Sequence, residues 1–169
     1  MPDLPFIWRP ARAFKPGRPG PINAIILHSS DGRKQGDLET LTGPEVSAHY
    51  YVTRDGALYH LVQDSDTAFH VGQADRPEHS NGRTIGIEQE HIDGQDDWPE
   101  AQLTTVARLV CALRLKHNYL PVLSHAAVAV PPGRKVDPQG YPWLLLSAAV
   151  EAEKGRSWWL VPAGEAKRK

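Results

Sequence analysis

The most constraining feature of the sequence is a short apolar run over residues 22–27, which ends at His28. A strand with one face in water alternates apolar and polar residues, whereas a strand covered on both faces has a nearly continuous apolar run. We therefore expect residues 22–27 to form a strand in the middle of a sheet, with other elements packed on both of its faces.

Further strand and helix patterns alternate along the chain. The pair Asp55-Gly56 lies between two β-rich runs, which is a typical pattern of a hairpin turn. Asp97 is a candidate N-cap for the clearest helical pattern, which ends at Asn118. The other expected strands cover residues 46–53, 57–62, 84–90 and 122–124, and the other expected helices cover residues 36–42 and 142–154.

Strands interleaved with helices, together with one hairpin, predict an α/β fold in three layers, with a mixed central β-sheet flanked by helices. The length of 169 residues fits one domain, which we assign to residues 22–155. Residues 1–21 are rich in proline and are expected to form an irregular arm. Residues 156–169 are expected to pack on the domain as an extension with a basic end, residues 167–169.

The composition and the N-terminal sequence limit the kinds of partner and cellular location that we expect. The formal net charge of -1 gives no electrostatic footprint for nucleic acid. No run approaches the roughly 18 apolar residues of a membrane span. The first residues lack the apolar segment of a secretory signal, so we expect no signal peptide and synthesis in the cytoplasm. The single cysteine, Cys111, excludes an internal disulfide. We also expect the protein to be a monomer.

The residues that suggest chemistry are concentrated in residues 124–138, which read SHAAVAVPPGRKVDP. His125 and Asp137 can each give one ligand to a metal ion. Lys135 precedes Asp137 by two positions, so in an extended segment the two side chains point to the same side. The ammonium group would then stabilise negative charge beside the metal. The alternative is an ordinary surface turn with a solvated lysine.

Two further candidates, His28 and Glu88, lie at the ends of expected strands, where open α/β sheets form their sites. His28, His125 and Asp137 together give the three protein ligands of a catalytic zinc, which keeps its fourth position for water. Glu88, as a carboxylate outside the metal shell, would take a proton from the water and pass it to the leaving group. This set describes metal-assisted hydrolysis of an amide or ester. The alternative is that the histidines are structural, because ligands spread along the chain form no local signature.

Five segments strengthen the enzymatic interpretation, and they occur in the order IILHSS, VSAHYYVTRDG, FHVG, TIGIEQEH and SHAAVAVPPGRKVDP. In this order they resemble the zinc-dependent N-acetylmuramoyl-L-alanine amidases, a family that includes phage endolysins, cell-wall recycling amidases and animal peptidoglycan recognition proteins. The resemblance covers about residues 22–150. It implies a mixed central sheet flanked by helices, one zinc ion per chain, and cleavage of the bond between the lactyl group of N-acetylmuramic acid and L-alanine.

The resemblance also implies roles for particular residues. His28 of IILHSS matches the first zinc ligand of the family, His125 matches the second and Asp137 the third. Glu88 of TIGIE resembles the proton-transferring glutamate of the recycling amidases. Lys135 resembles the lysine that lies two residues before the last ligand.

Two other histidines lie inside motifs that the family shares. We place His49 and His70 near the substrate cleft, with structural hydrogen bonding as the alternative. The chain departs from the family at Phe69, where tryptophan is usual, and at Ala48, where some phage members carry a tyrosine near the site. The second departure leaves Glu88 as the base.

The segment between His28 and Val46 lacks the long insertion associated with recycling enzymes. We therefore favour a lytic role on peptidoglycan, like that of a phage endolysin or an autolysin. Two alternatives stay open. A recycling amidase would cleave soluble muropeptides in the cytoplasm. A non-catalytic peptidoglycan-binding module would be expected to have replaced the third ligand, whereas Asp137 is present.

Overall fold

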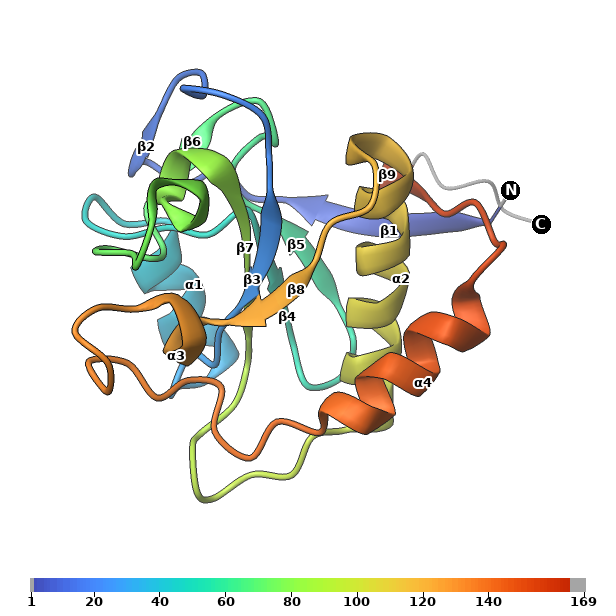
Figure 1. Cartoon of the computed structure of the whole chain (residues 1–169). Helices are drawn as coiled ribbons and strands as arrows, with labels where there is room; N and C mark the ends of the chain where they lie inside the picture. The colour runs from blue at the N-terminus through green and yellow to red at the C-terminus, as the bar shows by residue number, and fades with distance from the viewer. Residues whose placement is uncertain (1, 165–169) are drawn as a thin grey trace.

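Figure 1 shows the computed structural model of the chain, which describes residues 2–164. A seven-stranded sheet has the strand order β8-β3-β7-β4-β5-β1-β9. In this sheet β4 and β5 pair antiparallel and the other neighbours pair parallel, so the predicted mixed sheet is confirmed. Its strands are β1 (Asp3–Trp8), β3 (Ala24–Leu27), β4 (Tyr50–Val52), β5 (Leu58–His60), β7 (Thr84–Gln89), β8 (Val122–Ser124) and β9 (Trp159–Pro162). Two further strands, β2 (Phe14–Lys15) and β6 (Thr67–Ala68), form a separate small sheet.

Helices cover both faces of the sheet. They are α1 (Lys34–Leu41), α2 (Glu100–His117), α3 (His125–Val128) and α4 (Trp143–Glu153), with two short 3-10 helices, η1 (Pro77–His79) and η2 (Asn81–Arg83). Figure 1 shows α2 and α4 on one side of the sheet and α1 and α3 on the other, which confirms the three layers. In the part of the chain that the structure describes, no helix is long and apolar enough to cross a membrane.

Strand β3 is buried on both faces because its side chains alternate between two cores. Ile25 and Leu27 pack in the core that α2 closes. Ala24 and Ile26 pack with Val128 of α3 on the opposite face. Full burial of an isoleucine or leucine side chain stabilises a fold by about 1.5–3 kcal/mol. The continuous apolar run therefore fixes β3 between the helical layers.

The N-terminal residues differ from the predicted irregular arm, because Asp3–Trp8 forms strand β1. The first part of β1 pairs with β9, and Ile7 and Trp8 pair with β5. Leu4 is only 5% exposed and belongs to the main core. Proline has no N–H to donate to a sheet, so a proline-rich segment does not resemble an inner strand by its composition.

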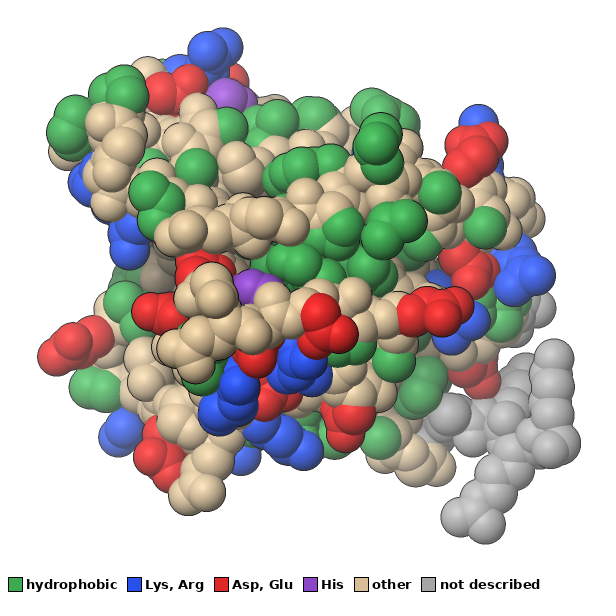
Figure 2. Space-filling view, turned by 90° about the horizontal axis from the view of Figure 1, so that it is seen from below, with side chains coloured by type: hydrophobic (Ala, Val, Ile, Leu, Met, Phe, Trp, Pro, Cys, Tyr) green, Lys and Arg blue, Asp and Glu red, His purple; other side chains and the backbone are tan. Residues whose placement is uncertain are grey.

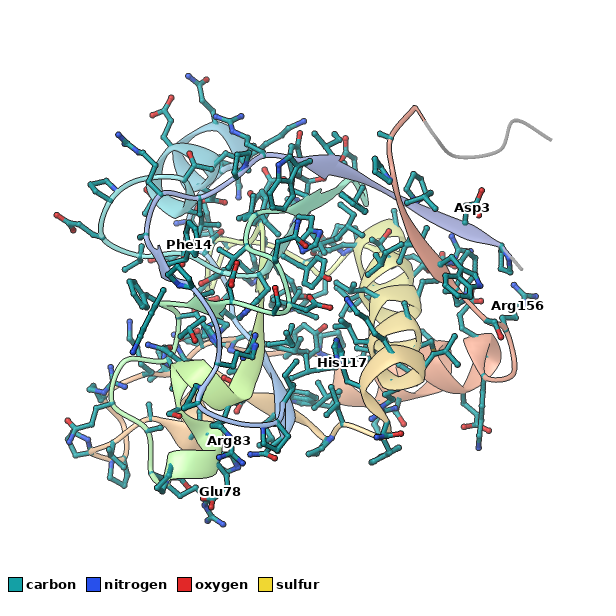
Figure 3. The ribbon with its side chains drawn as sticks, turned by 90° about the horizontal axis from the view of Figure 1, so that it is seen from above. Asp3, Phe14, Glu78, Arg83, His117 and Arg156 are labelled. Atoms are coloured by element: carbon teal, nitrogen blue, oxygen red, sulfur yellow. The ribbon has the colours of Figure 1, made fainter. Side chains whose placement is uncertain are left out.

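The C-terminal extension is joined to the sheet by β9, which lies beside β1. Trp158, in the segment before β9, is buried in the main core. Figure 3 shows Asp3 and Arg156 toward the same end of the molecule, where β1 and β9 pair. The predicted basic end, residues 167–169, lies outside the described residues.

The start of α2 also differs from the prediction. Pro99 occupies the N-cap position, and no side chain caps the helix there. The Asp97 side chain instead forms an ion pair with Arg54, whose Nη1 also donates to the Asp97 carbonyl oxygen at 2.8 Å. Arg54 lies in the turn between β4 and β5, so this contact joins the hairpin to the segment before α2.

The site is positioned by three parallel strands. Strand β3 pairs in parallel with β7 on one side and with β8 on the other. Leu27, at the end of β3, lies opposite Ile87 of β7 and Ser124 of β8. The residues that follow these three positions therefore meet at one edge of the sheet.

Candidate metal centre and catalytic cleft

Three side chains that could bind a metal meet at this edge. His28 follows β3, His125 is the first residue of α3, and Asp137 lies in the loop beyond α3. Each offers one ligand atom, and these atoms all lie within 4.8 Å of one another. The backbone carbonyl of Asp137 accepts a hydrogen bond from Ala126 N–H at 3.0 Å, which holds the loop against α3.

The spacing of these atoms suits a single zinc ion. The Nδ1 atoms of His28 and His125 are 3.0 Å apart. Asp137 Oδ2 lies 3.1 Å from the His125 Nδ1 and 3.4 Å from the His28 Nδ1. Ligand atoms at about 2.0–2.1 Å from a tetrahedral zinc lie roughly 3.3 Å from one another. Two imidazoles and one carboxylate also leave the fourth position for water, so the residues present fit a catalytic zinc.

The second ring nitrogen of His125 fixes the orientation of its ring. Nε2 lies 3.0 Å from the carbonyl oxygen of Val71. A carbonyl oxygen only accepts, so Nε2 carries the hydrogen and Nδ1 keeps its lone pair toward the other ligands. Burial raises the pKa of Asp137, but hydrogen bonds with His125 and His28 outweigh it and hold that pKa below its usual value. Ionised carboxylates and neutral imidazoles are the forms that bind metals.

Glu88 lies beside the ligands near the end of β7, and its side chain is 15% exposed. Its Oε1 is 3.9 Å from the His28 Nδ1. Its buried Oε2 has no hydrogen-bond partner among the described residues. Burial, followed by the nearby charges of Asp137 and Asp37, raises the pKa of Glu88 to about 8. A carboxyl group with such a pKa can take and give a proton near neutral pH.

Asp37 of α1 belongs to the surroundings of the site and was not found from the sequence. Its side chain is buried, and Oδ2 accepts hydrogen bonds from the Ser30 hydroxyl at 2.7 Å and the Tyr51 hydroxyl at 2.6 Å. The charge of Asp37 therefore helps to raise the pKa of Glu88, although burial and the charge of Asp137 contribute more. The only sequence signal was an acidic residue near the start of an expected helix, which is common at exposed helix ends.

A cleft of about 560 Å³ opens over these groups. It is lined by all five residues predicted to bind metal or take part in catalysis, which are His28, Glu88, His125, Lys135 and Asp137. Figure 2, seen from below, shows acidic and basic side chains around a histidine near the middle of this face, beside a patch of hydrophobic side chains. A larger groove of about 800 Å³ lies between α2 and α4 and is lined by none of the five.

Arg134, which the sequence did not single out, anchors the loop before Asp137. Its Nε donates to the Val130 carbonyl at 2.7 Å, and its Nη2 donates to the carbonyls of Val71 and Gln73 at 3.0 and 2.8 Å. The guanidinium group therefore joins this loop to the segment that follows β6. An arginine next to a predicted catalytic lysine carries no sequence signal of such a role.

The ring of His49, which we predicted near the substrate cleft, packs against the ring of His70. His49 is fully buried and does not line the cleft. Its Nδ1 accepts a hydrogen bond from Gly86 N–H at 3.0 Å, and its Nε2 lies 3.2 Å from the carbonyl oxygen of Asp66. Burial, followed by the charge of Arg18, lowers the pKa of His49 to about 3. The ring is therefore a neutral group inside the fold, in contact with backbone atoms and with the Arg18 guanidinium.

His70 is among the residues that line the cleft. However, both of its ring nitrogens have protein partners. Nδ1 lies 3.0 Å from the His28 Nε2, and Nε2 lies 3.2 Å from the Thr84 hydroxyl. The ring is therefore occupied by a candidate metal ligand on one side and by β7 on the other, and neither nitrogen is left for a substrate.

Comparison with known proteins links this site to one family. The family model described as N-acetylmuramoyl-L-alanine amidase matches residues 18–140. That range includes the three candidate ligands together with Glu88 and Lys135. The search of curated proteins finds no match.

Solved structures with the same fold include a selenomethionine derivative of AmpD, at 21% identity and a TM-score of 0.72, with 86% of this chain and 94% of that chain covered. The catalytic domain of XlyA has 22% identity and a TM-score of 0.62, with 86% and 98% covered. AmiD from E. coli, in complex with the substrate anhydro-N-acetylmuramic acid-L-Ala-D-gamma-Glu-L-Lys, has 26% identity and a TM-score of 0.68. In that comparison 76% of this chain is covered, and it spans 57% of AmiD.

Proposed function

This chain belongs to the N-acetylmuramoyl-L-alanine amidase family, and we propose that it hydrolyses the amide between N-acetylmuramic acid and L-alanine with one zinc ion. We propose His28, His125 and Asp137 as the ligands. The observation that carries this proposal is the convergence of their three ligand atoms beside Glu88, whose buried Oε2 has no partner among the described residues. A structural cluster of histidines would not require a partly buried acid of this kind in the same cleft.

Zinc in this site would supply Lewis acidity, which polarises a carbonyl group and lowers the pKa of a bound water. We assign the proton transfer to Glu88. A water oxygen bonds to the lactyl carbonyl carbon, and Glu88 takes one proton from that water. The carbon–nitrogen bond then breaks, and Glu88 returns the proton to the nitrogen of L-alanine. The products are the muramic acid carboxylate and a free amino terminus.

Lys135 has a different role in this proposal. Lys135 lines the same cleft and is exposed to solvent. An ammonium group has no lone pair with which to bind a metal, but it stabilises negative charge that develops on the carbonyl oxygen. We therefore propose that Lys135 acts on the transition state while Glu88 moves the proton.

The presence of Asp137 together with Glu88 and Lys135 argues against a binding module that has lost its metal. Between the two enzymatic roles, we favour a lytic enzyme acting on intact peptidoglycan, because the segment that contains α1 is short. A muropeptide-cleaving enzyme is the second candidate. The observation in its favour is the likeness to AmiD, which was solved with an anhydromuramoyl peptide.

The test is to incubate the protein with purified peptidoglycan and, separately, with a soluble anhydromuramoyl tripeptide. New L-alanine amino termini are labelled and counted in both reactions. Release from intact wall supports the lytic role, and release from the soluble peptide alone supports the second candidate. Asp137→Ala serves as the matched control, because it removes one ligand from the loop and should lower both zinc content and release. No new L-alanine termini from either substrate would contradict the proposed reaction.

A further inference from the structure

We infer that residues 69–72 form a support that orients both histidine ligands, with His70 as the positioning residue for His28 and the backbone carbonyl of Val71 as the partner of His125. This inference rests on the proposed zinc site. It assigns to the FHVG segment a role in holding the metal rather than in contacting the substrate.

His28, His70, Thr84 and the Ser80 carbonyl form a chain of hydrogen bonds. The direction of each bond follows from the carbonyl at the end of this chain. The Thr84 hydroxyl donates to the carbonyl of Ser80 at 2.9 Å, and a carbonyl cannot donate in return. The hydroxyl oxygen is then the acceptor for the His70 Nε2–H at 3.2 Å. His70 Nδ1 consequently has a lone pair, which accepts from the His28 Nε2–H at 3.0 Å.

This order leaves the His28 Nδ1 without hydrogen, on the side where the other ligands lie. That nitrogen is 3.0 Å from the His125 Nδ1 and 3.4 Å from the Asp137 Oδ2. The His70 ring meets the His28 ring edge-on, with an interplanar angle of 85°, so the contact fixes the tilt of the His28 ring as well as its tautomer. A partner of this kind usually determines which nitrogen of a histidine binds the metal.

The next residue along the chain does the same for the second ligand. The Val71 carbonyl oxygen accepts from the His125 Nε2–H at 3.0 Å and from the Arg134 guanidinium, also at 3.0 Å. Two adjacent residues therefore hold ligands that directly follow two different strands, β3 and β8. Displacing this short segment would disturb both imidazoles at once.

The segment is itself held in place by hydrogen bonds from another loop. The side-chain carbonyl of Asn81 accepts hydrogen bonds from the backbone N–H groups of His70 and Val71 at 3.0 and 2.8 Å. Gly86 of β7 gives the His70 ring its space, because a Cβ at Gly86 would lie 2.5 Å from the His70 Cγ. The glycine in TIGIE thus makes room for the ring that orients His28.

The experiment measures the dissociation constant of zinc, by competition with a chromophoric chelator, in His70→Phe and His70→Gln. Phenylalanine keeps a planar ring against Gly86 but cannot accept from the His28 Nε2–H. The amide oxygen of glutamine can accept. Loss of a partner of this kind typically lowers metal affinity by about 10–100-fold. We expect His70→Phe to bind zinc about 10–100-fold more weakly and His70→Gln to recover part of that loss.

A spectrum separates orientation from general damage. The visible absorption of the cobalt-substituted protein reports ligand geometry, and it should change in His70→Phe and return toward that of the unaltered protein in His70→Gln. Thr84→Val, which keeps the shape of Thr84 and removes its hydroxyl, should weaken zinc binding less than His70→Phe. His79→Ala is the matched control, because His79 bonds to Asp75 outside the cleft, and it should bind zinc normally.

The outcomes distinguish this inference from the proposed function. If the unaltered protein binds no zinc, the proposed zinc site and the inference both fail. If the unaltered protein binds zinc and His70→Phe binds it equally well with an unchanged cobalt spectrum, the inference alone is overturned. Equal losses in His70→Phe and His70→Gln would also overturn it, because the accepting group would then make no difference.

Discussion

Glu88 is the single residue whose substitution most cleanly separates chemistry from metal binding. It lies beside the ligand atoms, 3.9 Å from the His28 Nδ1, yet it is not one of the three candidate ligands. Glu88→Gln keeps the size of the side chain and removes its ability to carry a proton. General acid–base catalysis contributes about 10²–10⁴-fold to a rate, so we expect a loss of that size with zinc still bound at one per chain. The measurement is the rate of release of L-alanine termini beside the zinc content.

A Glu88→Gln protein with bound zinc and a normal rate would remove Glu88 from the proposed chemistry. A protein that had lost its zinc would show instead that Glu88 is needed for metal binding. Glu100→Gln is the control, since Glu100 starts α2 and does not line the cleft.

His49 gives a prediction about stability and pH at the same scale. Burial and the charge of Arg18 lower the pKa of His49 to about 3, while an unfolded histidine titrates near 6.5. Between these values the unfolded chain binds a proton that the folded chain does not, so the free energy of unfolding falls as the pH drops below about 6.5. The slope from one such group is up to about 1.4 kcal/mol per pH unit.

The measurement is denaturant unfolding of the metal-free protein at pH 7 and pH 5. We expect His49→Gln to lose less of its free energy of unfolding between these two values than the unaltered protein. His79→Ala, which changes a histidine in contact with Asp75 near the surface, should keep the full loss. An identical loss in His49→Gln would show that His49 is not held neutral by the fold.

How far the sequence predicts the site can be judged from these residues. The five motifs allowed His28, His125, Asp137, Glu88 and Lys135 to be chosen, and all five line one cleft. His49 has the same kind of motif around it, but its ring faces the interior of the fold. Whether a strand residue faces a cleft or the core depends on which strands are neighbours, and one sequence does not state that. No motif marks Asp37 or Arg134, because their partners include the Tyr51 hydroxyl and the Val71 carbonyl, which the fold brings to them from other strands and loops.

At the scale of elements, β1 is the strand that the sequence did not predict. Leu4 is 5% exposed and lies in the main core, whereas Ile7 in the same strand is 42% exposed. Truncation of a buried leucine to alanine costs about 2–5 kcal/mol. We expect Leu4→Ala to lower the free energy of unfolding by an amount in this range, and Ile7→Ala to lower it much less. Denaturant unfolding of the two variants checks this.

Equal, small effects of Leu4→Ala and Ile7→Ala would mean that β1 is a loosely attached arm, as its composition suggested. The other elements were predictable because a physical pattern marked them. The apolar run of β3 indicated burial on two faces, and Asp55-Gly56 indicated the β4–β5 hairpin. Their ends were less predictable, since β4 and β5 are shorter than the runs that contain them.

At the scale of the whole molecule, the candidate zinc site joins parts of the chain that the sheet brings together. Its ligands follow β3, begin α3 and lie in the loop beyond α3. Binding to the folded state alone adds RT ln(1 + [L]/Kd) to stability, which is about 2.7 kcal/mol when free zinc is a hundred times the dissociation constant. We expect a chelator to lower the melting temperature and zinc to restore it.

Asp137→Ala should show a much smaller response of its melting temperature to zinc, measured by scanning calorimetry. If the melting temperature of the unaltered protein changed with neither chelator nor zinc, the folded protein would not bind the metal. The fold and the family can be predicted from the order of the motifs. The substrate, intact cell wall or soluble muropeptide, cannot be predicted in this way. That choice depends on the shape of a cleft built from separate loops, and this fold is shared by a structure described as an endolysin and by one solved with an anhydromuramoyl peptide.

The most direct test of the central claim is to titrate metal-free protein with zinc while measuring the rate of release of L-alanine termini. If His28, His125 and Asp137 hold one catalytic zinc, the rate should rise in proportion to added zinc and reach its plateau at one equivalent per chain. Asp137→Ala should show no break at one equivalent. Full activity in metal-free protein, or a rate that does not respond to zinc, would contradict the account.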